Sequence, residues 1–548
     1  MRKILFPLIL FAFGQLTAQN WKHNQRTDSI VNAAFRYPAG PGFSVLVIQK
    51  GAIVYEKYLG FANIKKQIPI SAETRFPVGS VTKQFTATLI YLLQEEGKLK
   101  LSDEIHRYLP ELPNFGHPIT VGHLVSHTSG IRDHAEFLFL SGQGTDKNIS
   151  YSGLIQVLNN SPVLAFPPGT DFMYSNAGYE LLAMIAERAT GVTFGLLLKQ
   201  RIFDPLRMKN STCMWDDSKA LEGKTFSYTG SGKKFKKSST SYNAMGATGV
   251  QCTARDFYLW DQNYRQNRLG KGDQALINEM ITSYQEPEGL TMQYGAGLLT
   301  QNYRGYPTAE HAGGWNNYLM QYRRFPEQDF SVVVICNNSI YNPFALCDKL
   351  CDLVLESPGK NGTLKNSACP IPAEQFTGNY LSAYNLVRRV FSADSLICIA
   401  VPYGSKDVVY KLLFQKQISS ETVLFTDTTG KPVYFQKKDG KFAVLIWGGG
   451  HYFGVNREYY RIEPAQNPDP ENAGRYYSAD AKRWVRVKYN RRKQRLILKP
   501  LFFIRYPLTP VGSGIYALNE NGVILRFEKN GMIFGNEWLP GMRLTKKK

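Results

Sequence analysis

A serine and a lysine three residues apart, Ser80 and Lys83, are the side chains of this sequence best placed for covalent chemistry. On a helix, residues at this spacing lie on the same face. A serine hydroxyl gives up its proton reluctantly, and an amine held nearby in a pocket of low polarity can help to remove it. The pair therefore predicts a nucleophile that attacks an amide, ester or lactam carbonyl.

The same spacing occurs twice more, and the flanking sequence separates the three cases. Ser231–Lys234 and Ser357–Lys360 lie in stretches rich in glycine and lysine, which are typical of loops. Ser80 instead begins an apolar helical pattern that ends near Gly97. We therefore expect Ser80 in the first turn of a helix, where free backbone N–H groups and the positive helix end favour a developing oxyanion.

Two further motifs follow in chain order. Tyr174-Ser175-Asn176 precedes a predicted helix over Ala177–Ala189, and His311-Ala312-Gly313-Gly314 opens a strand-like run. Together with Ser80-Val81-Thr82-Lys83, they make the chain resemble the serine β-lactamase-related hydrolases of the penicillin-recognising superfamily. That superfamily carries Ser-x-x-Lys, Tyr-x-Asn and Lys/His-x-Gly in this order. Within the superfamily it resembles members of the D-stereospecific aminopeptidase and D-alanyl-D-alanine carboxypeptidase type.

The resemblance implies a role for each residue of the first two motifs. Ser80 is expected to become acylated, and Lys83 to help remove its proton. Tyr174 is expected to act as general acid and base, with its phenol pKa lowered by the neighbouring lysine cation. Asn176 is expected to hydrogen-bond Lys83 and the substrate amide.

The third motif implies how the substrate carbonyl is held and which substrates fit. The backbone N–H groups of Ser80 and Gly314 form the expected oxyanion hole, and a side chain at Gly313 or Gly314 would block the substrate. His311 stands where many β-lactamases carry lysine, a fixed cation for a substrate carboxylate. Because a histidine is charged only part of the time near neutral pH, the motif fits D-amino-acid peptides or esters better than β-lactams.

The pattern of predicted elements favours an α+β fold for residues 25–355. Strands are predicted at Phe43–Gln49, Ile53–Leu59 and Phe330–Cys336, the last pairing with the strand after His311, and a closing helix at Asn342–Leu355. Strands at both ends with helices between them indicate a β-lactamase-like domain whose antiparallel sheet joins its two ends.

The remainder of the chain is predicted to be all β. Residues 356–370 are rich in Pro, Gly, Asn and Lys and form a candidate linker. Beyond it, Gly378-Asn-Tyr380 is echoed 96 residues later by Gly474-Arg-Tyr476. The repeat predicts two small antiparallel barrel-like domains, over residues 371–463 and 471–548. A catalytic domain followed by two barrels is similar to the arrangement of D-stereospecific aminopeptidases.

The first residues have the pattern of a targeting segment. Arg2 and Lys3 are followed by the apolar run Ile4–Phe13 and by Leu16-Thr17-Ala18, which predicts a secretory signal peptide over residues 1–18. This run is too short to span a bilayer, and we see no other long apolar stretch. The expectation is a secreted or periplasmic protein without a transmembrane segment.

Positive charge is concentrated near the C-terminus. The chain carries a net charge of +21, and residues 371–548 hold 28 basic against 14 acidic residues. Lys482–Arg495 contains eight basic residues and no acidic one, in an alternation that predicts a strand with one basic face. Such a face is either a solvated, charge-protected edge strand or a contact with an anionic envelope polymer or membrane surface. Nucleic acid is not an expected partner.

Cysteines and histidines give no further chemistry. The seven cysteines are scattered, and Cys347 and Cys351 suit two buried thiols on a helix better than a disulfide. His123 and His127 have a metal-like spacing, but the glutamate of the zinc protease motif is missing, and the resembling family uses this segment structurally. We predict neither a metal nor a cofactor.

The sequence thus predicts an exported serine hydrolase that cleaves amide or ester bonds through an acyl-enzyme at Ser80. D-amino-acid peptides of the cell wall are the first substrate class. Two alternatives stay open: a promiscuous carboxylesterase, and a non-catalytic protein that keeps the fold to bind the cell envelope.

Overall fold

The computed structural model describes most of the chain. The described residues are 23–134, 150–160, 162–213, 223–232, 234–238, 245–282, 293–355, 369–382, 387–393, 396–403, 406–427, 432–447, 457–462, 469–478, 483–499, 506–512, 515–518, 524–528, 531–535 and 542–547. The predicted signal peptide over residues 1–18 and nearly all of the predicted linker lie outside them.

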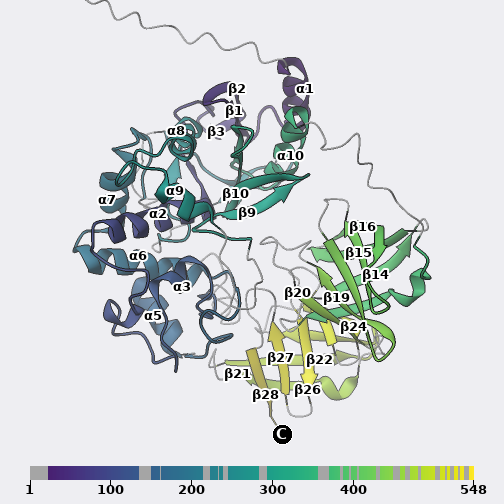
Figure 1. The fold of residues 1–548 in the computed structure, drawn as a ribbon. Helices are drawn as coiled ribbons and strands as arrows, with labels where there is room; N and C mark the ends of the chain where they lie inside the picture. The colour runs from purple at the N-terminus through teal and green to yellow at the C-terminus, as the bar shows by residue number, and fades with distance from the viewer. Residues whose placement is uncertain are drawn as a thin grey trace, which may run out of the picture.

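The N-terminal domain is built on one antiparallel sheet in the order β2-β1-β12-β11-β10-β9 (Figure 1). Its strands are β1 (Phe43–Gln49), β2 (Ala52–Leu59), β9 (Leu299–Tyr303), β10 (Tyr306–Trp315), β11 (Tyr318–Phe325) and β12 (Phe330–Cys336). The sheet therefore joins the two ends of the domain, as predicted. Short pairs flank it: β3 (Phe61–Asn63) with β4 (Ile68–Pro69), β5 (Phe76–Pro77) with β8 (Gln251–Cys252), and β6 (Tyr228–Thr229) with β7 (Lys236–Lys237).

Helices cover both faces of this sheet. The α-helices are α1 (Asn24–Ala34), α2 (Thr82–Glu95), α3 (Val121–Val125), α5 (Tyr151–Asn160), α6 (Asn176–Thr190), α7 (Phe194–Leu198), α8 (Ala254–Arg265), α9 (Ala275–Ile281) and α10 (Pro343–Val354). Shorter turns are η1 (Gly79–Val81), η2 (Ile105–Arg107) and the π-helical η3 (Lys199–Phe203).

Alternation along the central strands divides the core into two layers. In β1, Val45 and Val47 pack with helices α1 and α10, whereas Leu46 and Ile48 face the cluster that contains α2, α6 and α8. Successive side chains of a strand point to opposite faces, so a strand apolar throughout is buried on both sides. Figure 1 shows α1 and α10 together on one side of the sheet and the larger helical layer on the other.

Two closed barrels follow the N-terminal domain, which confirms the predicted fold class. The first contains β13 (Gly378–Ser382), β14 (Val387–Ala393), β15 (Leu396–Tyr403), β16 (Lys406–Gln417), β17 (Thr422–Asp427), β18 (Pro432–Lys438), β19 (Lys441–Trp447) and β20 (Arg457–Ile462), after η4 (Ala373–Gln375). The second contains β21 (Gly474–Ser478), β22 (Arg483–Asn490), β23 (Arg495–Lys499), β24 (Tyr506–Gly512), β25 (Ile515–Leu518), β26 (Ile524–Glu528), β27 (Gly531–Gly535) and β28 (Met542–Lys546), after η5 (Pro470–Asn472).

The sequence repeat marks equivalent strands of the two barrels. Tyr380 in β13 donates a hydrogen bond to the carbonyl of Phe376 (2.7 Å), and Tyr476 in β21 donates one to the carbonyl of Asn472 (2.8 Å). In each case the buried tyrosine ties the first strand to the 3-10 turn that precedes it. The repeat therefore encodes the start of each barrel.

The basic segment near residue 490 forms a strand with the predicted alternation. Val485 and Val487 of β22 are buried in the second barrel, while Arg486 and Lys488 are exposed. Of the two alternatives for its basic face, the edge strand was wrong, because β22 pairs with both β21 and β23 in a closed barrel, which has no edge there.

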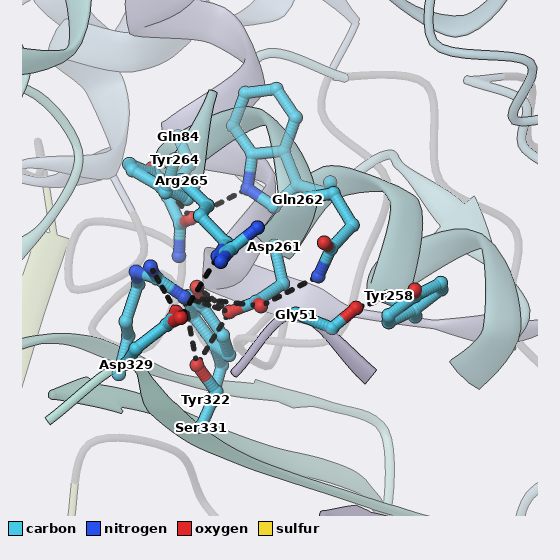
Figure 2. Close-up of polar contacts among 12 residues, drawn as sticks. Gly51, Gln84, Tyr258, Asp261, Gln262, Tyr264, Arg265, Tyr322, Asp329 and Ser331 are labelled. Atoms are coloured by element: carbon cyan, nitrogen blue, oxygen red, sulfur yellow. Dashed lines mark hydrogen bonds and ion pairs between the residues drawn. The ribbon is translucent and has the colours of Figure 1, made fainter. Parts of the chain in front are cut away.

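A buried amide fixes helix α2 against helix α8. Gln84 accepts hydrogen bonds at Oε1 from Nε1 of Trp260 (2.9 Å) and from the hydroxyl of Tyr264 (3.0 Å). Figure 2 shows Gln84 and Tyr264 meeting at the end of this network. Two donors converging on one acceptor restrict rotation of α2 about its axis, which orients the residues next to Gln84.

A buried carboxylate then fixes α8 against the sheet. Asp261 is fully buried and accepts from the hydroxyls of Tyr322 (2.9 Å) and Ser331 (2.5 Å), and from the guanidinium of Arg324 at 3.1 Å (Figure 2). Three strand side chains thus share one acid, so that β11, β12, α8 and α2 behave as one rigid unit.

The cysteines are free in this structure, including Cys347 and Cys351, whose sulfur atoms lie 3.9 Å apart on α10.

Among the described residues, no single helix combines the length and hydropathy of a membrane span. One pair bent by 82°, Asn176–Thr190 with Phe194–Phe203, passes that test on length and composition alone.

We expect Asp261→Asn to lower the free energy of unfolding of the N-terminal domain by about 3–5 kcal/mol, because it removes the buried carboxylate that pairs with the guanidinium of Arg324 at 3.1 Å and leaves that guanidinium with the more exposed Asp329 at 3.5 Å. Glu111→Gln is the control, since its partner Arg188 is 55% exposed and the pair should contribute less than about 1 kcal/mol. Urea unfolding of both variants measures the difference, and equal losses would contradict the assigned role of Asp261.

Candidate active site

Ser80 lies in the 3-10 turn η1, which runs directly into helix α2. The expectation of an α-helical first turn was therefore slightly wrong, since α2 begins at Thr82. Gly79 explains the difference: its φ is +55°, and a Cβ on it would lie 2.6 Å from the backbone N of Gly314. Only a glycine permits this left-handed turn so close to another backbone, and the turn brings Ser80 against strand β10.

Lys83 is fully buried one turn after Ser80 and has three acceptors around its amine. Nζ donates to Oδ1 of Asn176 at 2.8 Å, to the carbonyl of Ala247 at 3.1 Å, and to Oγ of Ser80 at 3.3 Å. The carbonyl and amide oxygens can only accept, so a neutral amine must turn its two N–H groups toward them. Its lone pair then faces the serine hydroxyl, as proton removal requires.

Burial also sets the charge of this amine. Loss of solvent lowers the pKa of Lys83 to about 7, against the opposing influence of the carboxylates of Glu180 and Asp133. Near neutral pH a large fraction of Lys83 is therefore unprotonated and able to accept a proton. The amine lies 4.6 Å from the centre of the Tyr174 ring. It is therefore close to Tyr174, as expected, but it is not the permanent lysine cation that was expected beside this phenol.

The start of helix α6 positions Tyr174 and Asn176. Ser175 is its N-cap, with Oγ accepting from the backbone N–H of Gly178 at 3.2 Å. The backbone N–H of Asn176 donates to the buried carboxylate of Asp133 at 2.5 Å, and that of Ser175 donates to Nδ1 of His127 at 3.1 Å. These contacts fix the helix start beside Lys83.

His127 occupies the centre of an aromatic cluster behind the site. Its ring centre lies 4.4 Å from that of Tyr174 and 4.8 Å from those of Tyr179 and Tyr294, and Nε2 is 3.2 Å from the hydroxyl of Tyr294. The spacing to His123 is not that of one helix, because α3 ends at Val125 and His127 has a φ of +60°. His127 therefore supports Tyr174, and His123 closes a capping box with Thr120.

The glycines of the third motif bring β10 against the turn that holds Ser80. Strand β9 pairs with β10 only as far as Glu310, so the edge beyond it faces η1. A Cβ on Gly313 would lie 1.9 Å from the carbonyl oxygen of Val78. This close approach of two backbones, not room for substrate, is what requires glycine at 313.

His311 lies on strand β10, next to the stretch that faces η1, and is fully buried. Its Nδ1 is 2.6 Å from the carbonyl oxygen of Ala312, its ring centre is 6.1 Å from that of Tyr174, and Nε2 has no hydrogen-bond partner among the described residues. Burial and the charge of Lys83 lower the pKa of His311 to about 3. The expectation of partial charge near neutral pH was wrong, since burial keeps this imidazole neutral.

The site therefore combines a hydroxyl, an amine that can accept its proton, a phenol and a neutral imidazole around one turn of helix. This set can support attack on a carbonyl with proton transfer, the chemistry of an acyl-enzyme. Within the described residues, no group of three or more His, Cys, Asp or Glu side chains could hold a metal ion.

Comparison with known proteins agrees with this geometry. The family model described as Beta-lactamase matches residues 31–349. The chain belongs to this beta-lactamase family. The family match and the named relatives indicate a serine hydrolase.

The relatives are distant and are covered in part. Penicillin-binding protein 4* of Bacillus subtilis is 27% identical over 313 residues, which are 54% of this chain and 67% of that protein. A D-aminopeptidase of Gluconobacter oxydans is 27% identical over 321 residues, 57% of this chain and 59% of that protein. The structure of an octameric penicillin-binding protein homologue from Pyrococcus abyssi matches with a TM-score of 0.54 at 24% identity, over 80% of this chain and 99% of that one, and supports the fold.

The structure adds residues to this beta-lactamase-family site that the motifs did not identify. Asp133, Glu180 and Tyr294 are buried around it, and Ala247 contributes only a backbone carbonyl. A carbonyl has no sequence signature. The acids do have a weak one, since Glu180 interrupts an otherwise apolar stretch of helix α6, where an acid is expected only with buried partners.

We expect the rate at which a fluorophosphonate labels the protein to rise about tenfold between about pH 6 and about pH 8, with a midpoint near the pKa of Lys83. The sign follows because neutral Lys83 accepts the proton of Ser80, and the neutral fraction grows as pH rises. Ser80→Ala should abolish labelling. Stopped labelling reactions across this pH range measure the profile, and a flat profile or a labelled Ser80→Ala protein would contradict it.

Proposed function

We propose that this serine hydrolase cleaves amides and esters that carry no carboxylate beside the scissile bond, through an acyl-enzyme at Ser80. The observation that carries the proposal is His311, a buried neutral imidazole at the position where many β-lactamases have a cation. A buried neutral imidazole supplies no charge here that could pair with a substrate carboxylate. β-Lactams and peptides with a free terminal carboxylate at this point would be poorly held.

In the proposed reaction, neutral Lys83 takes the proton of Ser80 while the hydroxyl oxygen attacks the carbonyl carbon. Tyr174 then relays a proton to the leaving amine or alcohol, which departs as the acyl-enzyme forms. The backbone N–H groups of Ser80 and Gly314 receive the oxyanion. Water subsequently attacks the ester, with the same groups acting in reverse order.

D-amino-acid amides and peptides are the proposed substrates. The name D-aminopeptidase among the relatives supports this choice, as does the neutral His311, because an N-terminal residue in an amide or in a peptide longer than two residues is cut away from any terminal carboxylate. A carboxylesterase of broad specificity is the second candidate, since the same neutral imidazole is compatible with simple esters. A D-alanyl-D-alanine carboxypeptidase fits less well, because its substrate carries a terminal carboxylate beside the scissile bond and the neutral His311 does not pair with it.

The proposed location is outside the cytoplasm. The basic and apolar residues of the first 18 positions support export, and cell-wall peptides would then be within reach of the enzyme. A non-catalytic envelope-binding role is less favoured, because the amine, amide and hydroxyl of the site keep hydrogen-bonding distances.

We expect the enzyme to hydrolyse D-alanine p-nitroanilide with a higher kcat/KM than the L-isomer, and to disfavour substrates with a carboxylate next to the scissile bond. His311→Lys should raise the relative kcat/KM for the carboxylated substrates about tenfold, since the new ammonium pairs with the carboxylate. His311→Gln, which stays neutral, is the matched control. A wild-type preference for carboxylated substrates would contradict the proposal.

A second surface has a proposed partner of its own. On the outside of the second barrel, Arg475 of β21, Arg486 of β22 and Lys499 of β23 are direct cross-strand neighbours. Strands lie about 4.8 Å apart, so these three side chains form one continuous row of positive charge. We propose that this row of cations contacts a phosphate-linked anionic polymer of the cell envelope.

We expect long-chain polyphosphate to bind the protein with an affinity that falls steeply with salt. Arg475→Gln, Arg486→Gln and Lys499→Gln together should weaken binding at least about tenfold. The control replaces three lysines of the first barrel, Lys437, Lys438 and Lys441, by glutamine, and changes net charge equally. Equal losses in the two triple variants would show that total charge, not this row, determines binding.

A further inference from the structure

The backbone carbonyl that receives the Lys83 amine is itself held by a buried acid. Glu180 lies within helix α6 and is fully buried. Its Oε2 accepts from the backbone N–H of Gly246 at 2.8 Å, and its Oε1 accepts from that of Ala247 at 3.0 Å. One carboxylate therefore holds two successive peptide groups, and the carbonyl of Ala247 is directed at Nζ of Lys83, 3.1 Å away.

A second set of contacts holds the same segment from the side of α2. Thr86 lies three residues after Lys83 on α2, and its Oγ1 donates to the carbonyl of Gly246 at 2.5 Å. A Cβ on Gly246 would lie 2.2 Å from the carbonyl oxygen of Tyr179. The segment is thus clamped between α2 and α6, and Glu180 is the charged part of the clamp.

The charge of Glu180 also acts on Lys83 directly. Glu180 is the largest of the influences that oppose the lowering of the Lys83 pKa by burial, followed by Asp133. The other titratable groups around the amine come from β10, the loop after α3 and the start of α6: His311, His127, Tyr174 and Tyr179. Burial keeps both histidines neutral, so the two carboxylates are the charges that face Lys83 among these groups.

We propose that Glu180 is a positioning residue for Lys83: it fixes the Ala247 carbonyl so that the amine lone pair faces Ser80, and it stabilises the protonated amine formed when that hydroxyl loses its proton. The inference rests on the proposed proton transfer from Ser80 to Lys83. If the carbonyl turned away, a neutral amine could donate an N–H to Ser80 in place of accepting from it.

The test compares Glu180→Gln with Glu187→Gln, a matched control on the same helix whose carboxylate also accepts a backbone N–H, that of Phe194 at 2.7 Å. The readout is the pH dependence of fluorophosphonate labelling, which does not depend on the natural substrate. We expect Glu180→Gln to move the midpoint about one unit lower, because Lys83 loses a nearby negative charge. The rate at high pH should fall about tenfold, and Glu187→Gln should change neither.

A measurement without turnover separates this inference from the proposed function. In Ser80→Ala protein with isotope-labelled lysine, NMR titration gives the pKa of Lys83 directly, and adding Glu180→Gln should lower it about one unit. A wild-type protein that resists labelling would overturn the proposed function, while this titration would still decide the electrostatic role of Glu180. An unchanged midpoint and pKa would overturn that role.

Thr86→Val tests the positioning of the Lys83 amine separately from the charge of Glu180. It also tests the positioning role if Glu180→Gln does not fold. It removes the hydrogen bond to Gly246 at nearly constant volume and leaves every charge in place. We expect the labelling rate at high pH to fall at least about threefold with the midpoint unmoved. A wild-type rate would show that the Gly246–Ala247 segment does not position the amine.

Discussion

The burial of one amine is the constraint on which the rest of the active site depends. A lysine taken out of water is costly as a cation, and the cost is reduced only if acceptors surround it. Here an amide oxygen of α6, a backbone carbonyl of Ala247 and the hydroxyl of Ser80 do so from three separate parts of the chain. Burial, opposed by the carboxylates of Glu180 and Asp133, lowers the pKa of Lys83 to about 7, where an amine can exchange protons at neutral pH.

The surrounding architecture keeps these three parts together. Helix α2, which carries Lys83, is fixed to α8 through Gln84, and α8 is fixed to the sheet through Asp261. The sheet in turn presents β10, whose glycines let its backbone approach the turn that holds Ser80. Buried polar networks of this kind are costly if incomplete, which favours a single arrangement of the site.

The environment of the site also underlies the proposed preference for substrates without a carboxylate at the scissile bond. Burial makes His311 neutral, so the strand that lines the site offers polarity without charge. Positive charge is instead displayed on the outside of the second barrel, whose apolar core touches the N-terminal domain at Val157 of α5. The chain thus separates an uncharged imidazole beside the reaction site from a cationic outer surface.

Local patterns determined much of this protein. The spacing of Ser80 and Lys83, the alternation of the strands and the pattern of the closing helix at Asn342–Leu355 predicted elements that the structure contains, because each depends on residues close in sequence. The Tyr380 and Tyr476 repeat likewise predicted two barrels. Motif order was sufficient to indicate the family.

Only the tertiary structure decided how these parts act. The neutrality of His311, the role of Glu180 and the requirement for glycine at 313 depend on contacts between segments separated by tens to hundreds of residues. Barrel closure likewise removed the edge that the basic alternation of β22 had suggested. A sequence records which side chains are available, whereas desolvation and the direction of a backbone carbonyl arise only when distant segments pack together.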